Sequence, residues 1–138
     1  MRSRSVLIVE NDLGVAEVAS AVLQDAGYTV TVMRSHDADE LSSTLAQLEP
    51  DLILLDGEGE VAGYGRSWDL AASIAERGRP IPVIMFTAHG RDVREARDAL
   101  SSRSKRANFA AIIDKPFDVD ELLGAVARVL DGAGPSQD

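Results

Sequence analysis

The sequence of 138 residues contains no cysteine, only two histidines and few aromatic side chains, which make up 4% of the chain. Without cysteine, neither a disulfide framework nor a thiolate metal site can form, and two histidines alone cannot complete a zinc centre. Long hydrophobic runs are missing too, since the apolar run behind the basic start covers only residues 6–9, too few for a signal-peptide core. We therefore expect a cytoplasmic protein with no membrane contact.

Positive charge is also scarce, with a formal net charge of -9 and a pI of about 4.6. This balance argues against direct nucleic-acid binding, because readers of nucleic acid concentrate positive charge. A composition of 45% hydrophobic and 27% charged residues is ordinary for a folded globular protein. The length suits one domain, which we place at residues 1–131, followed by a flexible C-terminal tail at residues 132–138.

Apolar strand-like runs alternate with helical patterns along the chain, which is typical of an α/β fold with a mostly parallel sheet. Five strands and five helices in this order predict a doubly wound sheet of three layers, with helices on both faces. The predicted strands are residues 6–9, 28–33, 52–55, 82–86 and 110–113. The predicted helices cover about residues 15–26, a segment between Ser35 and Pro50, and residues 68–75, 91–99 and 119–130.

Polar side chains follow directly after four of these strands. Because the carboxyl ends of parallel strands meet at one edge of a sheet, we expect them to share one crevice. Carboxylates that lie close together repel, so the crevice implies a divalent cation with oxygen ligands, such as Mg²⁺. Asp12 is better explained as a cap of the first helix. The residues at the strand ends are Glu10, Asn11, Asp12, Asp56, Thr87, Ala88, Asp114, Lys115 and Pro116.

Four separated motifs, at residues 6–12, 51–56, 82–88 and 114–117, resemble the receiver domain of bacterial response regulators, the chemotaxis-type domain of two-component systems. The resemblance spans about residues 4–130 and implies a flavodoxin-like sheet with strand order 2-1-3-4-5. It implies that Asp56 is the phosphoacceptor, receiving a phosphoryl group from a histidine kinase. Thr87, Ala88 and Lys115 would then bind the phosphoryl group.

The same resemblance implies a Mg²⁺ ion held by Glu10, Asn11, Asp56 and the backbone carbonyl of Glu58. Asn11 stands where the family usually has an aspartate, and a neutral amide is a weaker ligand for a hard cation. We therefore expect weak Mg²⁺ binding. The peptide between Lys115 and Pro116 is expected to be cis, as in the family.

Three further features depart from the family or lie outside its motifs. Ile112 occupies a switch position that usually carries an aromatic side chain. The segment from Arg91 to Arg106 is basic and longer than usual, and a solvated helix face explains it better than a docking patch. We expect His36 and His89 to face solvent.

The resemblance predicts a stand-alone response regulator receiver in a phosphorelay, with no enzymatic activity beyond its own phosphoryl transfer and dephosphorylation. Its expected partners are a sensor histidine kinase or histidine phosphotransfer protein, and an unknown downstream protein bound through the fourth helix, fifth strand and fifth helix. We expect a monomer or weak homodimer. The alternative is a pseudo-receiver interaction module that is phosphorylated poorly or not at all. Asn11 and Ile112 point to it, as does Glu60, which stands where the family usually has a proline. An enzyme of similar fold would need a nucleophile elbow, a P-loop or a dinucleotide fingerprint, which the sequence lacks.

Overall fold

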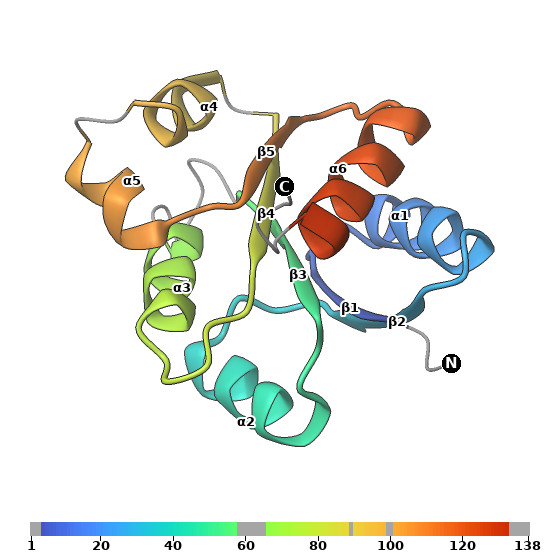
Figure 1. Cartoon of the computed structure of the whole chain (residues 1–138), viewed down its shortest axis with the longest axis horizontal. Coiled ribbons are helices and arrows are strands. Elements are labelled where there is room, and N and C mark those ends of the chain that lie inside the picture. The colour runs from blue at the N-terminus through green and yellow to red at the C-terminus, as the bar shows by residue number, and fades with distance from the viewer. Residues whose placement is uncertain (1–3, 58–65, 89, 99–100, 133–138) are drawn as a thin grey trace.

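The chain forms a five-stranded parallel sheet covered by helices in this computed structural model, which describes residues 4–57, 66–88, 90–98 and 101–132 (Figure 1). The strand order is β2-β1-β3-β4-β5, so the expected order and the three layers are confirmed. The strands are β1 (Ser5–Val9), β2 (Thr29–Met33), β3 (Leu52–Asp56), β4 (Val83–Thr87) and β5 (Ala111–Asp114). The helices are α1 (Leu13–Asp25), α2 (Ala38–Leu48), α3 (Arg66–Ala75), α4 (Gly90–Ala96), α5 (Ser102–Ala107) and α6 (Val119–Gly132).

The central strands are buried on both faces, which explains why they appear in the sequence as unbroken apolar runs. Successive side chains of a strand point to opposite faces. In β1, Leu7 and Val9 join the core under α2, α3 and α5, whereas Val6 and Ile8 join the core under α1 and α6. Figure 1 shows α1 and α6 on one side of the sheet and α2, α3 and α5 on the other. The sheet thus lies between two cores, and its central strands are packed on both faces.

The described part of the chain has six helices where the sequence predicted five. A separate helix, α5, begins at Ser101, whose side chain accepts a hydrogen bond from the backbone N–H of Ser104 at 3.1 Å. Asn108 ends it in the left-handed conformation, with φ 53°. Phe109 then packs edge-on against Trp68 of α3, with ring centroids 5.2 Å apart. The prediction was wrong because helical period alone did not register the serine cap within the basic segment.

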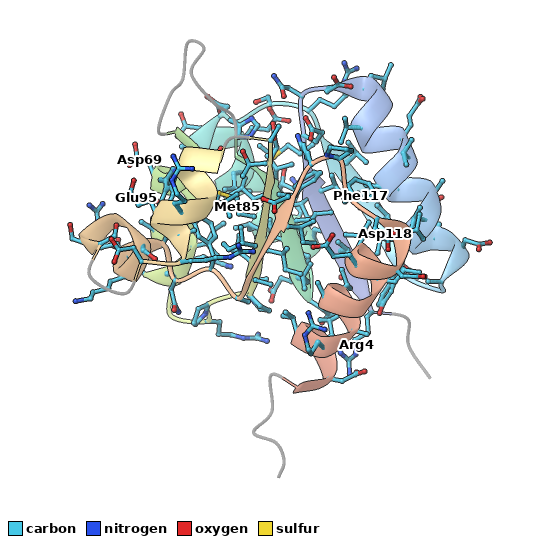
Figure 2. The ribbon with its side chains drawn as sticks, turned by 90° about the horizontal axis from the view of Figure 1, so that it is seen from above. Arg4, Asp69, Met85, Glu95, Phe117 and Asp118 are labelled. Carbon is cyan, nitrogen blue, oxygen red and sulfur yellow. The ribbon has the colours of Figure 1, made fainter. Side chains whose placement is uncertain are left out.

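The last helix ends at Gly132, one residue beyond the predicted domain boundary, and residues 133–138 lie outside the described part of the chain. Arg4 binds the end of this helix, donating to the Leu130 carbonyl at 3.0 Å. Figure 2 shows Arg4 beside the last turns of α6. A cation at a helix C-terminus complements the helix dipole. None of the helices described is long and apolar enough to cross a membrane.

The chain after β3 runs close to β4 at Gly57, whose N–H donates to the Phe86 carbonyl of β4 at 2.9 Å. A Cβ at this position would lie 2.8 Å from Thr87 Cβ and 3.1 Å from Met85 Sδ. We therefore predict that Gly57→Ala lowers the free energy of unfolding by about 1–3 kcal/mol, because the strands must separate to admit the methyl group. Urea denaturation monitored by circular dichroism measures this change.

The matched control is Gly78→Ala. No heavy atom other than those of Gly78 and its two chain neighbours lies within 4 Å of the Cβ that would be added at Gly78, so this substitution should change the free energy of unfolding by less than about 1 kcal/mol. Equal effects of the two substitutions would contradict the close approach at Gly57.

Candidate functional site

Three strand ends bring together one ammonium and two carboxylates. Lys115, which follows β5, donates to Glu10 Oε1 at 2.8 Å and to Asp56 Oδ1 at 2.7 Å. Glu10 follows β1, and Asp56 is the last residue of β3. The exposed fraction of the side chain is 1% for Glu10, 7% for Asp56 and 17% for Lys115. The parallel sheet thus makes one ion cluster from residues that lie far apart in the sequence.

Burial and ion pairing act in opposite directions on these groups. Burial raises the pKa of Glu10, and the hydrogen bonds from Lys115 and from the backbone of Asp12 only partly offset it. Burial lowers the pKa of Lys115, but its hydrogen bonds to Asp56 and Glu10 outweigh that effect, so the net shift is upward. Lys115 therefore stays charged near neutral pH and keeps the two carboxylates together.

The ammonium of Lys115 lies over a buried aromatic ring. The Nζ atom of Lys115 lies 4.7 Å from the centroid of the Phe86 ring in β4, a distance suited to a cation–π interaction. Phe86 in turn contacts Phe117, with ring centroids 6.4 Å apart. The peptide between Lys115 and Pro116 is cis. The side chain of Lys115 is therefore held against a buried ring and extends over the sheet edge.

The oxygen atoms of the two carboxylates differ in their partners. Glu10 uses both, since Oε2 accepts from the Asp12 N–H at 3.0 Å. Asp12 caps α1 by accepting from Val15 N at 3.1 Å, as the sequence predicted. Within the described residues, Asp56 Oδ1 binds Lys115 while Oδ2 accepts no hydrogen bond. Both oxygens of Glu10 are thus bound, whereas only Oδ1 of Asp56 is bound by a described residue.

Thr87, whose hydroxyl is predicted to bind the phosphoryl group, lies at the end of β4, next to β3 in the sheet. Thr87 is fully buried, and its Oγ1 donates to the Gly57 carbonyl at 3.1 Å. Ala88, the next residue, is exposed. Ile112 is half-buried and packs against the core under α2, α3 and α5. In this structure the threonine hydroxyl is bound to the loop after β3.

The oxygen donors suit a magnesium ion chemically. Glu10 and Asp56 supply carboxylate oxygens, and the side chain of Asn11 is exposed beside them in sequence. Glu58, whose carbonyl was also expected to bind the metal, lies outside the described residues. Among the residues that are described, no three Asp, Glu or His side chains gather into a metal site. The carboxylates fit Mg²⁺, with the amide of Asn11 as an uncharged third donor.

Two residues at this edge escaped the sequence prediction. His36 was expected to face solvent, but it is buried, and its Nε2 lies 3.1 Å from the Asp56 backbone oxygen. Ser67 of α3 donates to the same oxygen at 2.6 Å. His36 follows the end of β2 by three residues, so the position of this strand end in the sequence is a signal for it. Ser67 is a polar residue on the buried face of an amphipathic helix, and that signal was present in the sequence. His89 lies outside the described residues.

An apolar surface borders the ion cluster on the side of α1. A cavity of about 670 Å³ lies between α1 and the loop after β5, and Val15, Val18 and Phe117 help to line it. Figure 2 shows Phe117 and Asp118 at the entry to α6. Val18, which lines the cavity, is 54% exposed, and the first residues of the two neighbouring helices, Leu13 of α1 (48%) and Val119 of α6 (46%), are exposed as well. The ion cluster thus lies beside a surface suited to a protein partner.

We predict that Lys115→Met lowers the free energy of unfolding by about 3 kcal/mol at pH 7, because it leaves two buried carboxylates without a counter-ion. The loss should be smaller at pH 5. Removing Lys115 raises the pKa of Glu10 further. When the pKa of an acid is higher in the folded than in the unfolded state, the free energy of unfolding of the protein falls as the pH rises from the unfolded-state pKa to the folded-state pKa. Urea denaturation at both pH values measures this. Lys105→Met, which removes an exposed lysine, is the matched control, and equal losses in the two variants at both pH values would refute the prediction.

A family model and curated relatives match most of the chain. A family model for the response regulator receiver domain matches residues 6–127. The transcriptional regulator RpaA of Synechocystis is 32% identical over 126 residues, covering 91% of this chain and 48% of the relative. The transcriptional regulator NtrC of Salmonella typhimurium is 31% identical over 134 residues, covering 94% of this chain and 25% of the relative. The chain thus spans about half, or less, of the length of such relatives.

Solved structures share the fold. A putative response regulator from Chloroflexus aurantiacus superposes with a TM-score of 0.74 at 24% identity, covering 94% of this chain and 99% of that structure. A chemotaxis response regulator of Vibrio cholerae gives 0.73 at 22% identity, covering 94% and 100%. At these identities the likeness concerns the fold alone. The family match over residues 6–127, together with the shared fold, shows that this chain belongs to the response regulator receiver domains, the signalling modules of two-component systems.

Proposed function

We propose that Asp56 accepts a phosphoryl group from a phosphohistidine on a kinase or a histidine phosphotransfer protein. The observation that carries the proposal is the position of Asp56, which shares Lys115 with Glu10 through one oxygen and leaves its other oxygen without a hydrogen bond in the described residues. That oxygen attacks phosphorus while the bond from phosphorus to the donor nitrogen breaks. The imidazole keeps the electron pair of that bond, and Asp56 becomes an acyl phosphate.

Charge is the main obstacle to this reaction, because a carboxylate must approach an anionic phosphoryl group. Lys115 supplies a fixed positive charge 2.7 Å from the attacking carboxylate, and fixed charge of this kind stabilises the transferred group. Receiver domains generally bind Mg²⁺ at the phosphorylation site. Here Glu10, Asn11 and Asp56 would hold the ion, with the carbonyl of Glu58 as a further expected donor. The ion would add positive charge on the phosphoryl oxygens.

The threonine and its neighbour would respond to the new charge. Phosphorylation replaces the single negative charge of the carboxylate by a phosphoryl group that carries about 1.5 to 2 negative charges and three acceptor oxygens. Thr87 Oγ1, now bound to the Gly57 carbonyl at 3.1 Å, would exchange that acceptor for a phosphoryl oxygen. Ala88 would move with it, because it follows Thr87 directly. We propose that the change reaches a downstream protein through α4, β5 and α6.

The phosphodonor would dock over the apolar surface beside the ion cluster. A phosphohistidine can reach Asp56 only if its protein covers the edge of the sheet, and Leu13, Val18 and Val119 present apolar surface there. Receiver domains interact with histidine kinases or phosphotransfer proteins, and they are generally signalling modules without enzymatic activity. For this chain we propose no activity beyond its own phosphoryl transfer and dephosphorylation.

A second candidate function is a pseudo-receiver that binds partners without phosphorylation. Asn11 favours it, because replacing a carboxylate by an amide removes negative charge from the metal ligands. Ile112 favours it as well, since no aromatic side chain occupies the expected switch position.

Phosphorylation with a small donor separates the two functions. We predict that incubation with acetyl phosphate and Mg²⁺ adds one phosphoryl group to the protein, detected by intact-mass spectrometry, and that Asp56→Asn abolishes the gain. The reason is that Oδ2 of Asp56 has no hydrogen bond among the described residues and can attack phosphorus.

Asn11→Asp serves as the gain-of-function companion in the same experiment. The added carboxylate should lower the Mg²⁺ concentration for half-maximal phosphorylation by roughly tenfold, because hard cations prefer charged oxygen ligands. No modification of the wild type at any Mg²⁺ concentration would reject the proposed function and support the pseudo-receiver.

A further inference from the structure

The backbone carbonyl of Asp56 binds two buried side chains from different elements. His36, in the loop between β2 and α2, places Nε2 at 3.1 Å from the carbonyl oxygen, and Ser67 in the first turn of α3 donates to it at 2.6 Å. The two residues are only 3% and 2% exposed. Neither has a part in the proposed phosphoryl chemistry, yet both contact the residue that carries it.

The ladder of the sheet explains why this carbonyl needs side-chain donors. The last pair between β1 and β3 is Val9 with Leu55, so β1 stops one residue short of Asp56. On the other side of β3, the hydrogen bond to β4 is made by the next residue, because the N–H of Gly57 donates to the Phe86 carbonyl. A buried carbonyl without a donor costs about 1–3 kcal/mol. His36 and Ser67 supply the hydrogen bonds that a longer β1 would otherwise donate to this carbonyl.

The contact between His36 and the carbonyl also shows which ring nitrogen carries a proton. A carbonyl oxygen only accepts hydrogen bonds, so Nε2 of His36 must carry a proton to bind it. The hydroxyl of Ser67 must likewise point its hydrogen at the same oxygen. The two donors approach from the β2–α2 loop and from α3, and together they restrict rotation of the Asp56 peptide.

We propose that His36 and Ser67 are positioning residues, which orient the Asp56 carboxylate for phosphoryl transfer by holding its backbone carbonyl. This inference rests on the proposed function of Asp56. The side chain and the carbonyl share one Cα, so rotation of the peptide moves Oδ1 away from Lys115 and changes the direction of Oδ2. A misplacement of about 1 Å can lower the rate of an enzymatic step by 10²-fold.

The test compares two serines of the same helix. Ser67→Ala removes the donor, whereas Ser73→Ala removes an exposed hydroxyl from α3 and serves as the control. We expect Ser67→Ala to lower the maximal rate of phosphorylation by acetyl phosphate and Mg²⁺ by roughly tenfold, with little change in the half-saturating donor concentration. His36→Leu should act in the same direction, and His36→Gln, which keeps an N–H donor, should recover most of the rate.

A role in stability alone predicts a different pattern. Urea denaturation then shows Ser67→Ala to be less stable than Ser73→Ala, while the maximal rates of the folded variants are equal, and this result would overturn the proposal. The ¹³C chemical shift of the Asp56 carboxylate gives a readout that needs no phosphorylation. It should move in Ser67→Ala and stay constant in Ser73→Ala.

Failure of the proposed function gives another pattern. If the wild type is not phosphorylated, Asp56 is not a phosphoacceptor, and the chemical shift alone decides whether Ser67 orients its carboxylate. An unchanged shift in Ser67→Ala refutes the positioning role in either case.

Discussion

The ammonium of Lys115 between the carboxylates of Glu10 and Asp56 is the interaction on which the site depends. Contacts of 2.8 and 2.7 Å join the ends of β1, β3 and β5 across the edge of the sheet. Two buried carboxylates that share one ammonium would repel each other without it, because burial weakens the screening of charge by water. The lysine therefore neutralises the edge and at the same time prepares it for an anionic ligand.

The rest of the fold keeps this cluster in place. Cores on both faces bury the strands, and the ring of Phe86 lies against the ammonium of Lys115. Gly57 permits β3 and β4 to approach, while His36 and Ser67 serve the carbonyl that β1 leaves without a partner. Residues from all three layers thus hold the strand ends in place. The apolar surface beside α1 would bind the protein that delivers a phosphoryl group.

Much of this could be predicted from local patterns. Apolar runs and helical periods located all five strands, and the edge rule for parallel sheets brought Glu10, Asp56 and Lys115 together. Their ion contacts required a sheet register that no local pattern contains. The burial of His36 was missed because it depends on where β1 stops relative to β3. The helix at Ser102–Ala107 was missed because a single serine cap, and not a long apolar period, starts it.

A double-mutant cycle between Lys115 and Asp56 tests the central claim most directly. The free energies of unfolding of the wild type, Lys115→Met, Asp56→Asn and the double variant, measured by urea denaturation at pH 7, give the coupling between the two side chains. The ion cluster predicts a favourable coupling of about 1–3 kcal/mol. Additive effects of the two substitutions, with a coupling near zero, would contradict it.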